Sequence, residues 1–163
     1  MRAWRAGVVL LLLVAAGLFV QSPGAAFADG TRWRIQHRNF ANKCIDGNSG
    51  AGGQAYLWSC VRARNQYFHF DLVEGLYYHL RNDKTGLCLG SNGQWTDSPI
   101  YNLPCDGNWA THWSVYNQEG DYYTFVPRYL AGFCMTPTSE TDGTGIAQHV
   151  CQSSFDQWTW YRM

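Results

Sequence analysis

Six cysteines recur along the chain with a regular spacing, and this spacing constrains the fold more than any other feature of the sequence. The members of successive pairs are 16, 17 and 17 residues apart, and the first members are 44 and 46 residues apart. A period of about 45 residues therefore occurs three times and predicts three structural repeats. The cysteines are Cys44, Cys60, Cys88, Cys105, Cys134 and Cys151.

The repeat extends to large aromatic residues and to short strand-like runs. Phe68, Trp113 and Trp158 follow the second cysteine of each pair and are 45 residues apart. Alternating runs at 33–35, 77–80 and 122–126 precede each first cysteine, and clusters of Gly, Asn, Asp, Ser and Pro separate them. This pattern indicates antiparallel strands, about four per repeat, and no helical periodicity competes with it.

Three repeats of this kind restrict how the strands can close. A propeller needs 4–8 blades, which three repeats cannot supply. A single repeat is too small for a core of its own, so the three must share one. We expect a small barrel with a threefold axis, with Phe68, Trp113 and Trp158 at its centre.

The repeat symmetry also predicts how the cysteines pair. Six cysteines allow 15 connectivities, and the symmetry favours pairing within each repeat. The alternative is a metal site, but the chain has no Cys-x-x-Cys pair and no histidine pair at zinc spacing. We expect three disulfides and no metal.

The first 28 residues have the three parts of a secretory signal peptide. Arg2 and Arg5 precede an unbroken apolar run over 6–20, and a small-x-small site at 26–28 lies just before Asp29. The run is shorter than the roughly 20 residues of a membrane span, which favours a cleaved signal over an uncleaved anchor. We expect residues 1–28 to be removed and a mature domain, 29–163, to be secreted and extracellular, with no membrane span.

Charge and motif content argue against two classes of function. Without Arg2 and Arg5 the chain has 10 basic and 12 acidic residues, a net charge of −2, so nucleic acid is not an expected partner. The acids form no repeated pair for glycoside hydrolysis, no Gly-x-Ser-x-Gly motif occurs, and no cysteine is spare. We expect no enzyme, no catalytic residues and no cofactor.

The repeated pattern resembles the ricin B-type lectins. The shared features are a cysteine–apolar–Asp type of turn, a second cysteine and a Gln-x-Trp type of ending, and the resemblance covers all of 29–163. It implies an all-β protein, a β-trefoil with repeats at about 29–73, 74–118 and 119–163, each closed by one disulfide. It also implies binding of cell-surface or polysaccharide glycans.

In that family a repeat can hold one shallow sugar site, and repeat 1 matches it. An Asp after the first cysteine accepts bonds from sugar hydroxyls, an aromatic two residues before the second cysteine stacks on the sugar, and an Asn-Gln pair completes the polar contacts. Charged acceptors, amides and a flat ring suit these tasks chemically. The sugar-binding candidates are Asp46, Trp58, Asn65 and Gln66, with Tyr56 where the family often has Gln.

Repeats 2 and 3 lack the same set, so we expect neither to be a standard sugar site. A carboxylate from a nearby turn, Asp97 or Asp142, is the possible replacement. The equivalent positions are Gly90, Leu103, Ala110 and Thr111 in repeat 2, and Thr136, His149, Phe155 and Asp156 in repeat 3.

The sequence thus predicts a secreted lectin domain with one sugar site in repeat 1. The alternative is a protein-interaction or targeting subunit of a secreted, toxin-like complex, in which the sugar sites are eroded and a protein is the partner. Trp95 and Trp109, in Gly- and Asn-rich loops, would then form a separate contact surface. A secreted protease inhibitor is a more distant third reading.

Overall fold

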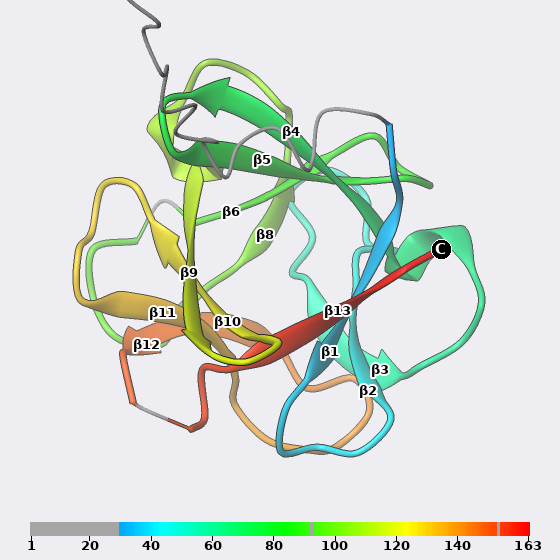
Figure 1. Cartoon of the computed structure of the whole chain (residues 1–163). Helices are drawn as coiled ribbons and strands as arrows, with labels where there is room; N and C mark the ends of the chain where they lie inside the picture. The colour runs from blue at the N-terminus through cyan, green and yellow to red at the C-terminus, as the bar shows by residue number, and fades with distance from the viewer. Residues whose placement is uncertain (1–29, 92, 153) are drawn as a thin grey trace, which may run out of the picture.

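The computed structural model describes residues 30–91, 93–152 and 154–163, so the predicted signal peptide at 1–28 and its cleavage site lie outside the described residues (Figure 1). Within these ranges no helix is long and apolar enough to cross a membrane. The elements are β1 (Trp33–His37), β2 (Lys43–Asp46), β3 (Tyr56–Ser59), η2 (Arg64–Gln66), β4 (Tyr67–Glu74), β5 (Tyr77–Asn82), β6 (Cys88–Gly90), β7 (Ser98–Pro99), β8 (Tyr101–Leu103), η3 (Trp109–Thr111), β9 (Trp113–Glu119), β10 (Tyr122–Pro127), β11 (Phe133–Pro137), β12 (Ile146–Val150) and β13 (Trp158–Arg162).

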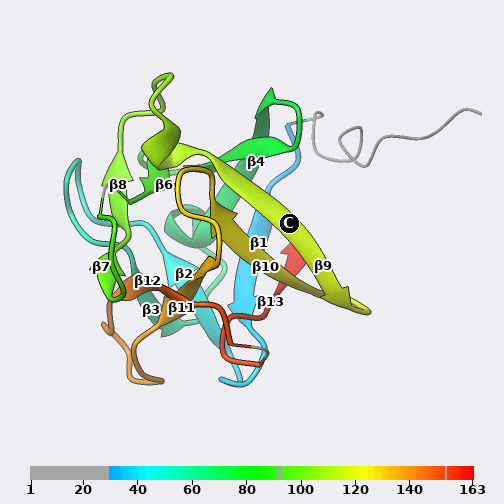
Figure 2. The same ribbon diagram turned by 90° about the vertical axis from the view of Figure 1, so that its left-hand side faces the viewer.

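Antiparallel strand pairs close into a barrel. The ring runs β1–β4–β5–β9–β10–β13 and returns to β1, so each repeat contributes its first and last strand. The inner strands of each repeat form the pairs β2–β3, β6–β8 and β11–β12. These pairs cover one end of the barrel, on the left in Figure 2. The fold is a β-trefoil, as predicted.

The threefold symmetry is visible in backbone hydrogen bonds where the three inner pairs meet. The N–H of Ala55 donates to the carbonyl of Ile100 at 2.8 Å, that of Ile100 to Ile146 at 2.9 Å, and that of Ile146 to Ala55 at 2.9 Å. All three residues are fully buried. Because this ring uses only main-chain groups, it joins the three repeats whatever side chains lie at their outer surfaces.

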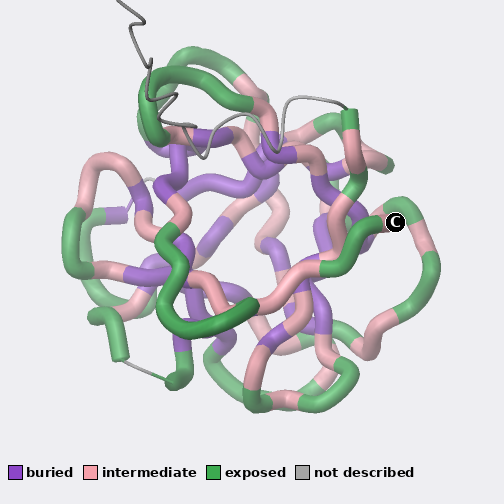
Figure 3. Tube along the Cα trace, viewed as in Figure 1, coloured by how far each residue is buried: buried purple, intermediate pink, exposed green. Residues whose placement is uncertain are grey.

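The predicted aromatic centre of the core is confirmed. Phe68, Trp113 and Trp158 have no exposed surface and belong to one hydrophobic cluster. The buried indole N–H groups are satisfied: that of Trp113 donates to the Leu89 carbonyl at 2.7 Å and that of Trp158 to the Met135 carbonyl at 2.9 Å. Figure 3 shows buried backbone at the centre and exposed backbone in the outer loops.

The strand count differs from four per repeat at one place. The expected strands at 33–35, 77–80 and 122–126 are parts of β1, β5 and β10. In repeat 2, however, the third strand is divided at Ile100 into β7 and β8. The cause is a change of partner, because β7 pairs with β12 of repeat 3 whereas β8 pairs with β6.

Three disulfides have the predicted pairing. Each bridge joins cysteines 16 or 17 residues apart, and among the described residues no cysteine is free. In the chain-entropy model a loop of this size stabilises the folded state by about 3 kcal/mol. The bridges are Cys44–Cys60, Cys88–Cys105 and Cys134–Cys151.

Candidate functional site

The β2–β3 hairpin brings the sequence-predicted residues of repeat 1 together. In its antiparallel register Asp46 is opposite Tyr56, and Cys44 is opposite Trp58. Residues on alternate positions of a strand point to the same face, so Tyr56 and Trp58 lie side by side, with ring centroids 6.0 Å apart and planes at 79°. The turn η2 supplies Asn65 and Gln66 from the other side.

The Asp46 carboxylate is the centre of a hydrogen-bond network. Its Oδ1 accepts from the backbone N–H of Asn48 at 2.9 Å, and its Oδ2 accepts from the amides of Asn65 at 2.6 Å and Gln66 at 3.2 Å. Only 2% of Asp46 is exposed. A carboxylate offers about four lone-pair sites, so the protein itself already uses most of its capacity. Polar neighbours therefore cover most of the carboxylate, a feature that the sequence did not predict.

Gln66 holds the carboxylate in place and is itself held at both ends. Its amide nitrogen also donates to the Ser59 carbonyl at 3.1 Å, and its amide oxygen accepts from the backbone N–H of Val61 at 2.7 Å. Gln66 is fully buried. These contacts fix the orientation of the amide, so Gln66 holds the Asp46 carboxylate in place.

Tyr56 places a phenol next to Asp46. Burial raises the pKa of the Tyr56 hydroxyl, and the negative charge and hydrogen bond of Asp46 raise it further, while a hydrogen bond with Asn48 lowers it. The phenol therefore stays protonated at neutral pH and remains a hydrogen-bond donor. Tyr56 thus takes part of the acceptor capacity of the Asp46 carboxylate.

Trp58 is the exposed part of the repeat 1 site, with 42% of its surface accessible. It borders a loop of repeat 3 that the sequence analysis had not connected with it. A Cβ added to Gly143 would lie 3.7 Å from the Trp58 ring. In the same loop, the Asp142 carboxylate accepts from the Lys43 ammonium at 2.6 Å and from the Ser59 hydroxyl at 2.8 Å. Asp142 thus lies next to repeat 1, not in a site of repeat 3.

Repeat 2 has no room for the missing carboxylate. A Cβ at Gly90, the position equivalent to Asp46, would lie 2.7 Å from the carbonyl oxygen of Ala110. Because that oxygen accepts from the backbone of Ser91 at 2.9 Å, it cannot easily move. The backbone geometry therefore explains why repeat 2 carries glycine there.

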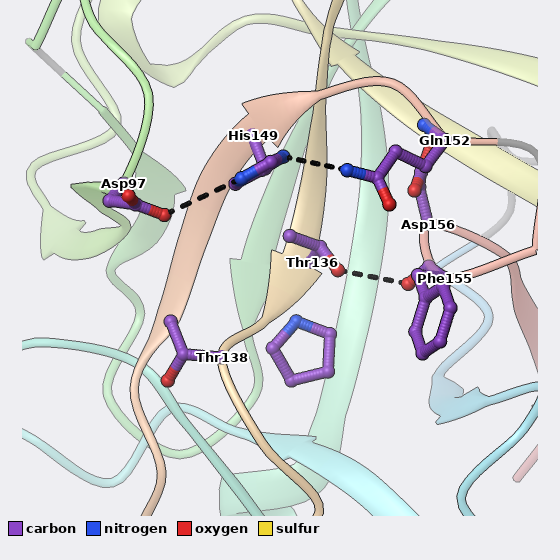
Figure 4. Close-up of a pocket in the computed structure, with 8 residues that line it drawn as sticks. Asp97, Thr136, Thr138, His149, Gln152, Phe155 and Asp156 are labelled. Carbon is purple, nitrogen blue, oxygen red and sulfur yellow. Dashed lines mark hydrogen bonds and ion pairs between the residues drawn. The ribbon is translucent and has the colours of Figure 1, made fainter.

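Repeat 3 contains a hollow of about 240 Å³ at the position equivalent to the repeat 1 site (Figure 4). The Asp97 carboxylate, from repeat 2, lies 3.8 Å from the His149 ring at its rim. Sequence reasoning considered Asp97 as a replacement but did not predict a hollow. The lining residues are Asp97, Thr136, Pro137, Thr138, His149, Gln152, Phe155 and Asp156.

The described residues include two groups of closely spaced candidate metal ligands. Each group contains two disulfide-bonded cysteines. A disulfide sulfur is not a thiolate, so it does not provide the ligand that zinc takes from cysteine. The groups are His79 with Cys88 and Cys105, and Asp156 with Cys134 and Cys151.

Comparison with known protein families agrees with the β-trefoil fold. The family model of the ricin-type beta-trefoil lectin domain matches residues 31–121 and 76–163. No curated protein sequence gives a significant match.

Solved structures share the fold at low sequence identity. The designed threefold-symmetric protein ThreeFoil is 18% identical, with a TM-score of 0.76 over 81% of this chain and 99% of that chain. A mosquitocidal holotoxin is 15% identical, with a TM-score of 0.75 over 81% of this chain and 17% of that one. The Macrolepiota procera ricin B-like lectin in complex with lactose is 17% identical, with a TM-score of 0.68 over 82% and 96%.

Proposed function

We propose, because this chain belongs to the family of ricin-type β-trefoil lectins, that it is a secreted lectin whose sugar site lies in repeat 1. The family supports a carbohydrate-binding domain; the location of the site is our inference from the residues. The observation that carries it is the pairing of a positioned carboxylate, Asp46, with an accessible indole, Trp58, on one hairpin.

The two parts of this site match the two kinds of surface on a sugar. The face of Trp58 is available to the C–H groups of a pyranose ring. The polar side chains around Asp46 can exchange hydrogen bonds with adjacent hydroxyls, and Asn65, which is only partly buried, can turn toward a ligand. Because the carboxylate is covered, a bound hydroxyl must displace one of its present donors, Asn65 or Tyr56.

Such a site binds weakly. Each hydrogen bond contributes about 0.5–1.5 kcal/mol net, and one stacked ring adds about 1 kcal/mol. After the cost of lost translational freedom, we expect a dissociation constant of about a millimolar. Binding to surfaces that display many sugars then requires clustering of several chains.

A glycan array tests this proposal, with lactose, the ligand of the Macrolepiota procera complex, as the first soluble sugar in titration calorimetry. The parent protein should bind a defined set of glycans, and Trp58→Ala should bind none of them. Leu103→Ala, which changes the equivalent position of repeat 2, is the matched control and should bind as the parent does. Equal binding by Trp58→Ala and the parent would place the site elsewhere.

A targeting or protein-interaction subunit of a secreted complex is the second candidate. Its support is the exposed apolar tip of the β4–β5 hairpin, with Leu72 and Val73 at the end of β4 and Leu76 in the turn, together with the exposed Trp95 and Trp109. The fold also occurs as a part of a mosquitocidal holotoxin. If the array is blank and a secreted protein co-purifies from culture supernatant, with Leu76→Ser abolishing the association, this function replaces the first.

A further inference from the structure

The three disulfides are equivalent in the fold but differ in the side chain that lies beside their sulfur atoms. Gln66, Thr111 and Asp156 occupy the same place in their repeats, since they are 45 residues apart and each lies two residues before a core aromatic. A carboxylate oxygen of Asp156 and the sulfur atoms of Cys134 and Cys151 all lie within 4.8 Å of one another. The repeat 3 bridge therefore has an acid at a place where repeat 1 has an amide and repeat 2 has a hydroxyl.

The repeat 3 bridge is also the one that solvent reaches best. Cys151 is exposed, whereas the corresponding cysteines of the other repeats, Cys60 and Cys105, are only partly exposed. Its partner Cys134 is 1% exposed. Both cysteines line a cleft of about 310 Å³ between β10 and the loop that closes repeat 3. An attacking thiol therefore meets the bridge at Cys151, and exposed disulfides are the ones that exchange most readily.

Opening the bridge at Cys151 puts a negative charge on Cys134, and a buried charge without a partner is costly. Among the described residues that line the cleft, Asp156 is the only ionisable side chain, since both cysteines are bridged. Asp156 is 5% exposed, and burial raises its pKa, an effect that a hydrogen bond from the Gln152 N–H and the charge of His149 partly oppose. Near neutral pH such a carboxyl group keeps a larger protonated fraction than a surface acid, so it can supply the missing proton.

The other two bridges lack this combination. In repeat 1 the amide of Gln66 has no acidic proton to give. In repeat 2 a ring nitrogen of His79 lies within 4.8 Å of the sulfur atoms of Cys88 and Cys105. Burial lowers the pKa of His79, so its ring carries less of the protonated form at neutral pH than an exposed histidine would. The same molecule thus contains two reference bridges for any measurement of exchange.

We propose that the Cys134–Cys151 bridge is a thiol-exchange site, at which a small thiol becomes attached reversibly to Cys151. The thiolate of the small molecule attacks the Cys151 sulfur, a new sulfur–sulfur bond forms, and the electron pair of the old bond moves to the Cys134 sulfur. The Asp156 carboxyl group transfers its proton to that sulfur and recovers from water the proton that the small thiol had released. The products are a mixed disulfide at Cys151 and a neutral thiol at Cys134. The exchange uses no residue of the repeat 1 sugar site and does not rest on the lectin function.

Timed exposure of the secreted, disulfide-bonded protein to 2-mercaptoethanol tests the proposal. N-ethylmaleimide stops the reaction, and peptide mass spectrometry then assigns each cysteine as bridged, alkylated or joined to 2-mercaptoethanol. The repeat 3 bridge should open first, about tenfold faster than the repeat 1 bridge, because only repeat 3 combines access with a proton donor. The adduct should lie on Cys151 and the maleimide on Cys134. The proposal is wrong if another bridge opens as fast, or if the adduct lies on Cys134.

Substitution of Asp156 separates proton donation from simple exposure. Asp156→Asn keeps an acceptor oxygen for the Gln152 N–H but has no acidic proton. Exchange at repeat 3 should slow about tenfold relative to the repeat 1 bridge, less than the loss of a full general acid because water takes over part of its role. In the parent, the rate divided by the thiolate concentration should fall as pH rises through the pKa of Asp156, and in the variant it should stay constant.

The control and the parent protein keep the question decidable. Asp121→Asn removes an exposed acid from the β9–β10 turn and should exchange as the parent does. If Asp156→Asn does not fold, the order of bridge opening and the position of the adduct in the parent decide the question alone. A folded Asp156→Asn protein with the parent's rate and pH dependence overturns the proposal.

Discussion

Replacing Asp46 by Asn perturbs the repeat 1 network at its centre. The substitution keeps the shape but exchanges one acceptor oxygen for a donor amide. If the remaining oxygen keeps the Asn48 N–H, the new amide faces the amide nitrogens of Asn65 and Gln66, which are both donors. Gln66 cannot rotate to relieve this, because the Val61 N–H occupies its oxygen.

The expected cost follows from the number of donors left without a partner. Each unsatisfied buried group costs about 1–3 kcal/mol. Gln66 keeps its bond to Ser59, and Asn65 can turn to water, so we expect a total loss of about 2–3 kcal/mol. A domain with about 5–15 kcal/mol of stability remains folded after such a loss.

Urea denaturation measures this loss directly. The Asp46→Asn midpoint should fall while the dependence of the unfolding free energy on urea stays that of the parent. Asp121→Asn, an exposed control, should have the parent's midpoint. An unchanged midpoint for Asp46→Asn would refute the network, because it would mean that the buried amides find other partners at no cost.

Further predictions address the exposed platform, processing and pH. Trp58→Ala should abolish sugar binding in calorimetry but lower the urea midpoint much less than Asp46→Asn, because the ring is 42% exposed; an equal loss of stability would contradict a surface role. Mass spectrometry of the secreted protein should give a mature start at Asp29 and no free thiol; a retained leader would indicate the anchor. Burial lowers the pKa of His37, whose ring accepts the backbone N–H groups of Asn39 and Phe40. Because the unfolded chain then binds the proton more readily, the unfolding free energy should fall as pH drops below about 6.5, and His37→Gln should weaken that dependence.

Repeat spacing predicted the fold because it reports on symmetry. If three similar repeats share one core, Phe68, Trp113 and Trp158 must occupy equivalent places around one axis. This inference does not require the conformation of the loops. The disulfide pairing agreed with the same symmetry, since pairing within repeats treats the three units alike.

The environment of each candidate site was harder to predict, because part of it comes from another repeat. Asp142 contacts Lys43 and Ser59 across the repeat boundary, and Asp97 approaches His149 in the same way. The sequence carries a signal for this, the 45-residue interval between Asp97 and Asp142, but no local pattern shows which repeat a loop will touch. Likewise, the presence of Asp46 and Tyr56 in the sequence does not show how many hydrogen bonds the Asp46 carboxylate accepts from neighbouring side chains.

This architecture lets binding sites diverge while the fold stays constant. The backbone ring through Ala55, Ile100 and Ile146 and the buried aromatic core hold the repeats together without using any residue of the repeat 1 site. The candidate site of repeat 1 and the hollow of repeat 3 each combine a hairpin of their own repeat with a loop of the preceding repeat around the axis. We therefore expect a substitution in one of these loops to alter the place that it contacts and to leave the other repeats unchanged. The repeat 3 hollow illustrates this, since Thr136 and Asp156 line it where repeat 1 has Asp46 and Gln66, and the barrel strands on either side keep their pairing.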